Sequence, residues 1–273
     1  MGTEEAEVAL LYWVFKYTAF VWLVRLLFRP WIEGEENIPR RGGAILVSNH
    51  ISAGDTFLVP SMIRRRMTFP AKLELFHGKG FTGRLLSWFL RGVGQVPMDR
   101  SGGRASAGSM DSVLDVLRAG KLLGIYPEGT RSPDGRLYKG KTGVARLVLR
   151  AGVPVIPVAV INTQLVRSKV FGIPTMRRPG IRIGKPMDFT AYAAAGNDRE
   201  VLRWITDEIM NAVMELSGQV YVDAYGASVK DALEQGRSVD AKILSRPGEG
   251  RPKPPVPQSA PARPAEAPEG LSA

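Results

Sequence analysis

The sequence has no cysteine and only two histidines, His50 and His77. Without cysteine the chain forms no disulfide, has no thiolate nucleophile and offers no cysteine ligand for zinc. Any imidazole chemistry must therefore use one of the two histidines. Acidic residues are also scarcer than basic ones, 26 against 37, so the net charge is +11. A charge of this sign attracts polyanions such as nucleic acid, anionic lipid or phosphorylated substrates.

A long apolar segment, residues 8–28, follows the acidic start "MGTEEAE". A signal peptide would begin with basic residues instead. Lys16 lies near the middle of the segment and would cost about 2.5–3.5 kcal/mol inside a membrane span. The pattern therefore favours a helix that enters one leaflet, with a full span and a buried core helix as alternatives. Arginines follow the segment, which predicts that the rest of the chain lies on the cytoplasmic side.

Short apolar runs then alternate with helical patterns. The runs predict strands at residues 44–47, 67–71, 94–98, 122–126, 155–160 and 181–183. Helices are predicted at residues 56–65, 81–90, 105–119, 142–151 and 198–217. Such alternation predicts an α/β fold with a largely parallel sheet flanked by helices.

The composition changes at residue 246, and the last 28 residues hold 8 of the 20 prolines. This change predicts a disordered tail. The predicted organisation is a membrane-associated helical segment at 1–30, one α/β domain at 31–245 and a disordered proline-rich tail at 246–273.

The stretch "GRLYKGKT", residues 135–142, matches the P-loop pattern G-x-x-x-x-G-K-[ST]. A working P-loop begins where a strand ends, but residues 127–134 separate this match from the nearest predicted strand. No later apolar strand ends in an aspartate that could bind magnesium. The stretch therefore predicts a surface turn followed by a helix from about Gly140. A nucleotide-binding membrane protein remains an alternative function.

The stretch "SNHISAGDTF" places His50 directly after a predicted strand and Asp55 five residues later. On a regular helix the two side chains would not share a face. They can meet if His50 lies on the strand-to-helix loop, with Gly54 easing the turn, and Asp55 lies in the first helical turn. A carboxylate that accepts from one imidazole nitrogen sets the tautomer required of a general base. The alternative is a helix cap beside an incidental histidine.

A covalent intermediate has no obvious nucleophile, although Ser48 and Ser52 lie near His50. The simpler chemistry is direct: His50 removes a proton from a bound hydroxyl, which attacks an activated carbonyl. Arg131, in "PEGTRS", follows another predicted strand and suits phosphate. Lys72 and Arg100 also end or follow predicted strands, so these cations are candidates for one anion pocket.

The stretches "NHISAGD", "GQVPMDR", "YPEGTRS" and "GVPVIPVAV" resemble, in order and spacing, the four motifs of glycerolipid acyltransferases, particularly bacterial 1-acylglycerol-3-phosphate acyltransferases. The resemblance covers residues 32–189. It implies an acyltransferase fold held on the cytoplasmic face of the cytoplasmic membrane. It also implies that His50 is the general base and Asp55 its partner. The substrate-binding residues that it implies are Lys72, Arg100, Glu128, Gly129, Thr130 and Arg131.

The implied reaction transfers a fatty acyl group from an acyl thioester to 1-acyl-sn-glycerol-3-phosphate and gives phosphatidate for phospholipid biosynthesis. Acyl-CoA or acyl carrier protein would be the co-substrate, without a metal or other cofactor. The implied partners are these substrates and an anionic membrane surface, and not nucleic acid. Alternatives are another acceptor, such as a lyso-ornithine lipid, and a membrane-associated binding module without catalysis.

Overall fold

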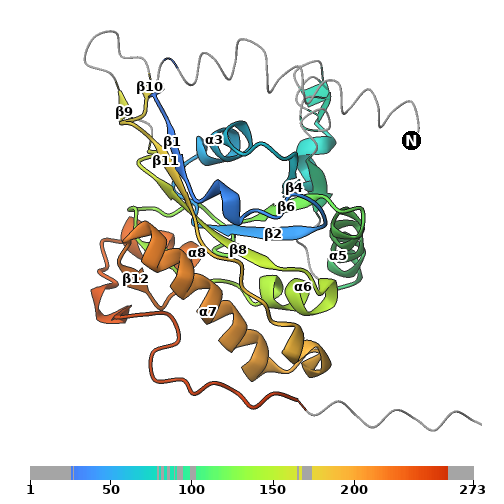
Figure 1. The fold of residues 1–273 in the computed structure, drawn as a ribbon. Helices are drawn as coiled ribbons and strands as arrows, with labels where there is room; N and C mark the ends of the chain where they lie inside the picture. Colours follow the sequence, from blue (N-terminus) through green and yellow to red (C-terminus); the bar gives the residue numbers. More distant parts are fainter. Residues whose placement is uncertain are drawn as a thin grey trace, which may run out of the picture.

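The computed structural model of the protein describes residues 26, 28–78, 80, 83–84, 87–88, 90, 95–98, 103–164, 166–167 and 174–257. Its centre is a six-stranded sheet with the strand order β1-β11-β8-β2-β6-β3 (Figure 1). These strands are β1 (Trp31–Glu33), β2 (Ala44–Ser48), β3 (Met67–Thr68), β6 (Leu122–Ile125), β8 (Val155–Ile161) and β11 (Gly180–Ile183). Four of the five neighbouring pairs are parallel, and β11 with β8 is antiparallel. The predicted α/β fold with a largely parallel sheet is confirmed.

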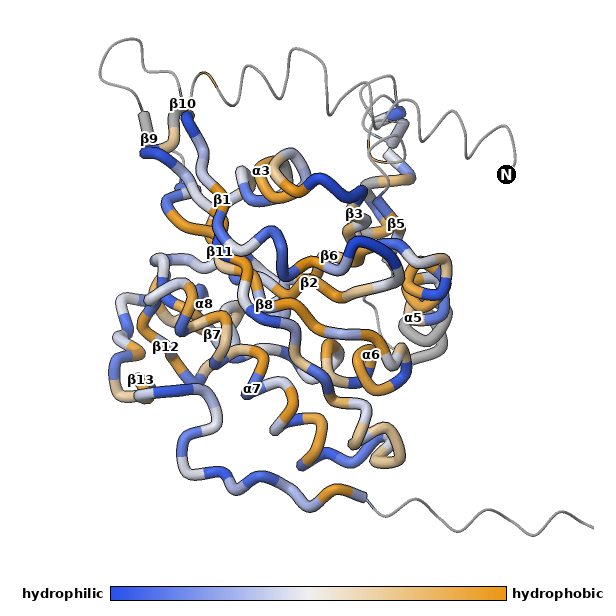
Figure 2. The backbone as a smooth tube through the Cα atoms, viewed as in Figure 1, coloured by the Kyte–Doolittle hydropathy of each residue, from blue (hydrophilic) through white to orange (hydrophobic). Residues whose placement is uncertain are grey.

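Helices cover both faces of the sheet. They are α3 (Asp55–Met62) on one face, and α5 (Gly103–Arg118), α6 (Gly143–Ala151) and α7 (Arg199–Ser217) on the other (Figure 1). Successive side chains of a strand point to opposite faces. Ile45 and Val47 accordingly pack with α5, α6 and α7, whereas Ala44 and Leu46 pack with α3. Figure 2 shows the hydrophobic residues gathered on the central strands and on the covering helices.

The sequence signals for α7 agree with its structure. The Asp198 side chain caps the helix by accepting from the amides of Glu200 and Val201, which are two of the unpaired donors of a helix start. The helix ends at Gly218, which has a φ of 70°, in the left-handed region that suits glycine. The predicted range of 198–217 is therefore correct within one residue.

A small second sheet was not predicted. It consists of β7 (Leu137–Tyr138), β12 (Tyr221–Val222) and β13 (Ile243–Leu244), next to α8 (Gly226–Glu234). Each of its strands has only two residues, which is too short for an alternating pattern to identify. β12 pairs in parallel with β7, so the C-terminal region is bound to a segment that lies about 80 residues earlier in the chain.

The remaining elements are short. They are β4 (Pro70–Lys72), β5 (Val96–Met98), β9 (Val166–Arg167), β10 (Pro174–Thr175) and the 3-10 helices at Glu35–Asn37, Leu73–Phe76, Thr190–Ala195 and Asp240–Lys242. The predicted strand at 67–71 is divided between β3 and β4. Half of the predicted helix at 81–90 lies outside the described residues, and the described half (83–84, 87–88 and 90) is helical.

The structure describes little of the N-terminal segment and nearly half of the predicted C-terminal tail. Nearly all of the predicted N-terminal segment lies outside the described residues, and within the described ranges no helix is long and apolar enough to cross a membrane. At the other end, residues 246–257 contact the domain: Arg251 pairs with Asp207 at 2.6 Å, and the Tyr192 hydroxyl donates to the Pro254 carbonyl at 3.0 Å. The structure thus differs from the predicted start of disorder at residue 246, because basic side chains there find acidic partners on α7. Residues 258–273 lie outside the described residues.

Candidate active site

His50 and Asp55 meet at the carboxyl end of β2. His50 lies on the β2–α3 loop (residues 49–54), and Asp55 is the first residue of α3. The Nδ1 atom of His50 lies 2.9 Å from Oδ2 of Asp55. The same oxygen accepts from the amides of Ile51 at 2.7 Å and Ser52 at 2.9 Å. Asp55 is fully buried, while the His50 side chain keeps 16% of its exposure, so the carboxylate fixes one nitrogen and leaves Nε2 for another partner.

The turn at Gly54 does not use the conformational freedom of glycine that the sequence predicts. Its φ is −61°, an ordinary helical value, so the turn itself does not require glycine. A Cβ at this position would instead lie 2.2 Å from Cε of Met176. Met176 would have to move to admit a side chain there, and Cε is the end of a flexible side chain.

Tyr126 stacks on the imidazole of His50. The ring centroids are 4.1 Å apart and the planes differ by 14°. Phe69 in turn stacks on Tyr126, with the two ring centroids 5.7 Å apart. The stack and the Asp55 contact together restrain the plane of the imidazole. Sequence reasoning missed Tyr126, although an aromatic residue directly after a neighbouring parallel strand was the available signal.

Glu128 joins the β2–α3 loop to the β6–α6 segment (residues 126–142). Its Oε1 accepts from the His50 amide at 3.0 Å, and its Oε2 accepts from the Tyr138 amide at 3.1 Å. Burial raises the pKa of this carboxyl to about 8, although the two amide donors oppose the shift. Both oxygens of this predicted substrate-binding residue thus contact the protein backbone.

The next residues of the motif lead from the buried Glu128 to the surface. Gly129 has a φ of 71°, which favours glycine, and Thr130 lies partly buried against the start of α8. Arg131 is exposed. The following residue, Ser132, donates its amide to the His50 carbonyl at 2.7 Å. Arg131 therefore lies at the same sheet edge as the histidine.

The other two predicted cations are less completely described. Lys72 is the last residue of β4, which follows β3 after a single residue. Its backbone thus continues from the carboxyl end of β3, toward the edge that holds His50. The Lys72 side chain and the whole of Arg100 lie outside the described residues.

The P-loop match does not form a phosphate cradle. A cradle needs free backbone amides, but six amides in this stretch already have acceptors. Those of Gly135 and Arg136 donate to the side chains of Ser132 and Asp134. The other four bonds run from Leu137 to Val220 O, Tyr138 to Glu128, Lys139 to Ala224 O and Lys141 to Pro127 O. Helix α6 begins at Gly143, one residue after the start of the helix predicted at 142–151 and three residues after Gly140.

Ser48 and Ser52 are held in other contacts. The Ser48 hydroxyl donates to Asn49 O at 3.1 Å, and the Ser52 hydroxyl donates to Thr163 O at 2.6 Å. Neither of these contacts involves His50. This arrangement supports attack by a substrate hydroxyl rather than by a serine.

A buried amide network braces the site from the C-terminal region. Asn49 donates to Oε1 of Gln219 at 2.6 Å, and Gln219 donates to Gly135 O at 2.6 Å. Asn49 also accepts from the Val160 amide at 2.8 Å. Gln219 lies 170 positions from Asn49, so no local sequence signal identified this contact.

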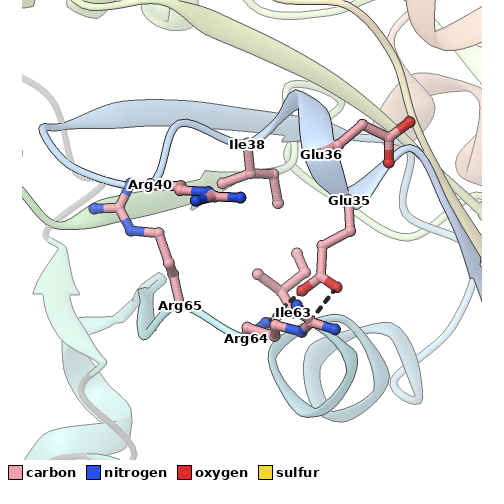
Figure 3. Close-up of a pocket in the computed structure, with 7 residues that line it drawn as sticks. All are labelled: Glu35, Glu36, Ile38, Arg40, Ile63, Arg64 and Arg65. Carbon is pink, nitrogen blue, oxygen red and sulfur yellow. Dashed lines mark hydrogen bonds and ion pairs between the residues drawn. The ribbon is translucent and has the colours of Figure 1, made fainter.

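One surface cavity lies away from this site. It has a volume of about 350 Å³ and is lined by Glu35, Glu36, Ile38, Arg40, Ile63, Arg64 and Arg65 (Figure 3). Arg65 donates there to the carbonyls of Pro39, Gly42 and Gly120, which precede β2 and β6. The cavity is thus at the amino edge of the sheet, opposite His50. Among the described residues, no group of three or more histidine, aspartate and glutamate side chains is arranged to hold a metal ion.

Comparisons with known proteins agree with these motifs. The model of the acyltransferase family matches residues 29–161. A chloroplast 1-acyl-sn-glycerol-3-phosphate acyltransferase of Arabidopsis thaliana is 32% identical over 48% of this chain and 36% of its own length. The 1-acyl-sn-glycerol-3-phosphate acyltransferase of Pseudomonas aeruginosa is 30% identical over 51% of this chain and 52% of its own length. Matches to the first relatives span only 36–51% of those proteins.

Two further matches are longer. The crystal structure of the 1-acyl-sn-glycerophosphate acyltransferase of Thermotoga maritima has a TM-score of 0.53 at 22% identity and covers 78% of this chain and 94% of that one. This similarity supports the fold. The 1-acyl-sn-glycerol-3-phosphate acyltransferase of Limnanthes alba is 32% identical over 76% of this chain and 67% of its own length. Since that similarity extends over two thirds of a relative, the chain belongs to the acyltransferase family.

Proposed function

We propose that the protein transfers a fatty acyl group from an acyl thioester to the free hydroxyl of 1-acyl-sn-glycerol-3-phosphate, which gives phosphatidate. The observation that carries this proposal is the contact of 2.9 Å between His50 and the buried Asp55. Such a contact sets the tautomer, so that Nε2 is the nitrogen that accepts a proton. The names of the similar proteins supply the class of substrate.

In the proposed reaction, His50 Nε2 removes the proton of the acceptor hydroxyl as its oxygen attacks the thioester carbonyl. A carbon–oxygen bond forms, the carbon–sulfur bond breaks, and the imidazolium returns the proton to the thiolate. Asp55 stabilises the imidazolium, and the Tyr126 stack holds the ring in position. The protein's own groups thus account for every proton that moves.

Binding of the acceptor phosphate is assigned to Arg131, with Lys72 and Arg100 as further candidates. Arg131 is exposed, and the residue after it donates its amide to the His50 carbonyl; a guanidinium forms paired hydrogen bonds with phosphate. Holding the phosphate places the hydroxyl near the base. The donor is an acyl thioester of coenzyme A or of acyl carrier protein.

We also propose that the protein acts at the cytoplasmic face of the cytoplasmic membrane. The apolar residues 8–28 and the net charge of +11 support this location, since anionic lipid attracts basic segments. Flotation of the full chain with vesicles, compared with a chain that lacks residues 1–28, tests the attachment. Equal flotation of both chains would contradict a role for the N-terminal segment.

The activity is tested by thiol release from acyl-CoA with three samples: 1-acyl-sn-glycerol-3-phosphate, a lyso-ornithine lipid and no acceptor. Acyl carrier protein replaces coenzyme A in a parallel series. His50→Ala should lower the rate by about three to four orders of magnitude, whereas His77→Ala, at the only other histidine, should leave it unchanged. Release that does not depend on the phosphate acceptor, or that persists in His50→Ala, would contradict the proposal.

A further inference from the structure

The cations of the β6–α6 segment divide into two groups, and the first group is paired. Arg136 contacts Asp134 and Asp240, each at 2.7 Å. Lys139 contacts Asp223 at 3.0 Å. These contacts connect the segment to the C-terminal region and compensate both positive charges.

The second group is Arg131 and Lys141. Both side chains are exposed, and neither forms a hydrogen bond or ion pair with another side chain in the part of the chain that the structure describes. The segment has two acidic residues: Asp134 pairs with Arg136, and Glu128 is turned inward to the amides of His50 and Tyr138. The segment thus buries this carboxyl and presents two cations to solvent at the edge that holds His50.

The position of the Lys141 side chain is specific. A Cβ built on Gly129 would lie 3.0 Å from Cε and 3.1 Å from Nζ of Lys141. The Lys141 amide also donates to Pro127 O at 2.8 Å, which fixes the backbone beside the turn. The ammonium group therefore lies against Gly129, two residues before Arg131, although ten positions separate the two cations in sequence.

Two uncompensated cations on one turn repel each other, and a bound anion removes that repulsion. A phosphate monoester carries about −1.5 to −2 charges at pH 7, more than one cation neutralises. A phosphodiester carries a single negative charge. A second cation at this turn therefore favours a monoester over a diester.

We propose that Lys141 binds the acceptor phosphate together with Arg131 and selects a phosphate monoester. The proposal rests on the proposed function and adds a specificity residue to it. It also assigns a role to the lysine of the P-loop match: Lys141 contacts phosphate through its side chain, on a turn whose amides are already used. The ligand is the headgroup of a lysolipid rather than a nucleotide.

The kinetic test compares Lys141→Met, Lys141→Arg and the control Lys121→Met. Lys121 is an exposed lysine just before β6, at the opposite edge of the sheet, so its replacement removes the same charge from the chain. For 1-acyl-sn-glycerol-3-phosphate, Lys141→Met should raise KM roughly 10- to 100-fold, the effect of one hydrogen bond to a charged group. The value of kcat should change less than about threefold, and Lys141→Arg should restore much of the affinity.

The acceptor series supplies the specificity readout. With 1-acyl-glycerophosphoglycerol, a diester, Lys141→Met should raise KM by a much smaller factor than with the monoester. Lys121→Met should leave both KM values within about twofold. An equal KM for the monoester in Lys141→Met and Lys121→Met, while wild-type turnover is normal, would overturn the Lys141 proposal and leave the proposed function intact.

A binding measurement separates the two proposals in the other direction. Calorimetric titration with glycerol 3-phosphate needs no acyl transfer. Lys141→Met should raise the Kd for glycerol 3-phosphate by about the same factor as it raises KM. If no acceptor is acylated but this loss of binding is seen, the proposed function is wrong and the phosphate site stands. If glycerol 3-phosphate binds equally to wild type and Lys141→Met, Lys141 is not a phosphate ligand.

Discussion

Two connections at the same edge of the sheet are held in different ways. In the β2–α3 loop the carboxylate of Asp55 is held by its own neighbours, because it accepts from three groups within five residues of itself. Other contacts of this loop, from Asn49 and Ser52, reach distant residues. The β6–α6 segment is held from far away, by β12, Gln219 and Asp223. The pair proposed for chemistry, His50 and Asp55, is thus joined by local contacts, whereas the segment that carries the cations proposed for the acceptor is joined to the C-terminal region. Glu128 and Ser132 each bond to both connections.

The C-terminal contacts also lie beyond the matched family region, which ends at residue 161. The structure therefore shows that residues outside the matched region support the "PEGTRS" motif. The different support of the two connections predicts that variants in the β2–α3 loop change the rate of the chemical step. Variants that loosen the second should change stability and acceptor binding.

The largest expected effect is that of Asp55→Asn. The variant keeps an oxygen for the amides but loses the charge that stabilises the imidazolium, so kcat should fall by about 10³- to 10⁴-fold. The acceptor KM should stay within about threefold. Steady-state kinetics checks both values, with Asp231→Asn on the exposed face of α8 as the control. A loss confined to KM would contradict the division between the two connections.

A smaller effect is expected on the pH dependence of stability, through Glu128, which bonds to both connections. Its pKa is raised from 4.5 to about 8 in the folded protein. The stabilising contribution of the protonated carboxyl is therefore fully present below pH 4.5 and is lost as the pH rises to about 8. The free energy of unfolding should fall over this range with a slope of at most about 1.4 kcal/mol per pH unit from this group.

Glu128→Gln should flatten that slope, because glutamine does not titrate. Denaturant unfolding at several pH values between 5 and 8 measures the difference from wild type, and the exposed Glu36→Gln serves as the control. Parallel pH profiles for wild type and Glu128→Gln would show that the pKa of Glu128 is not raised.

The smallest effect is expected for Gln219→Ala, which removes the bridge between Asn49 and Gly135. The free energy of unfolding should fall by about 1–3 kcal/mol, because buried polar groups lose their partners. The acceptor KM should rise more than kcat falls, since Asn49 keeps its bond to Val160. Urea denaturation and kinetics check this, with the exposed Gln235→Ala as the control. Equal losses in the two variants would mean that distant support of the segment is unimportant.

Local patterns in the sequence were sufficient for much of the fold. Helix α7 has a capping aspartate, an apolar stripe and a terminal glycine, so its range was correct within one residue. The buried strands β2, β6 and β8 are continuous apolar runs, as parallel strands covered on both faces require. The contact between His50 and Asp55 followed from the same reasoning, since both lie on one short connection.

The features that were missed depend on distant parts of the chain. The strands of the small second sheet have two residues each, and Gln219 contacts Asn49 across 170 positions. The tail was judged from its proline content, whereas Arg251 pairs with Asp207. Composition measures what a segment can do alone and does not include partners supplied by another segment.

The sequence by itself determined the α/β class, the main strands and helices, and the histidine with its aspartate, because hydrophobic periodicity and short-range turns act within a few residues. Only the tertiary structure decided that Tyr126 stacks on His50, that Glu128 faces inward and that Lys141 lies against Gly129. Those arrangements depend on which strand ends lie side by side and on where the C-terminal region docks. Such contacts join distant segments of the chain, and they form only when the whole domain packs.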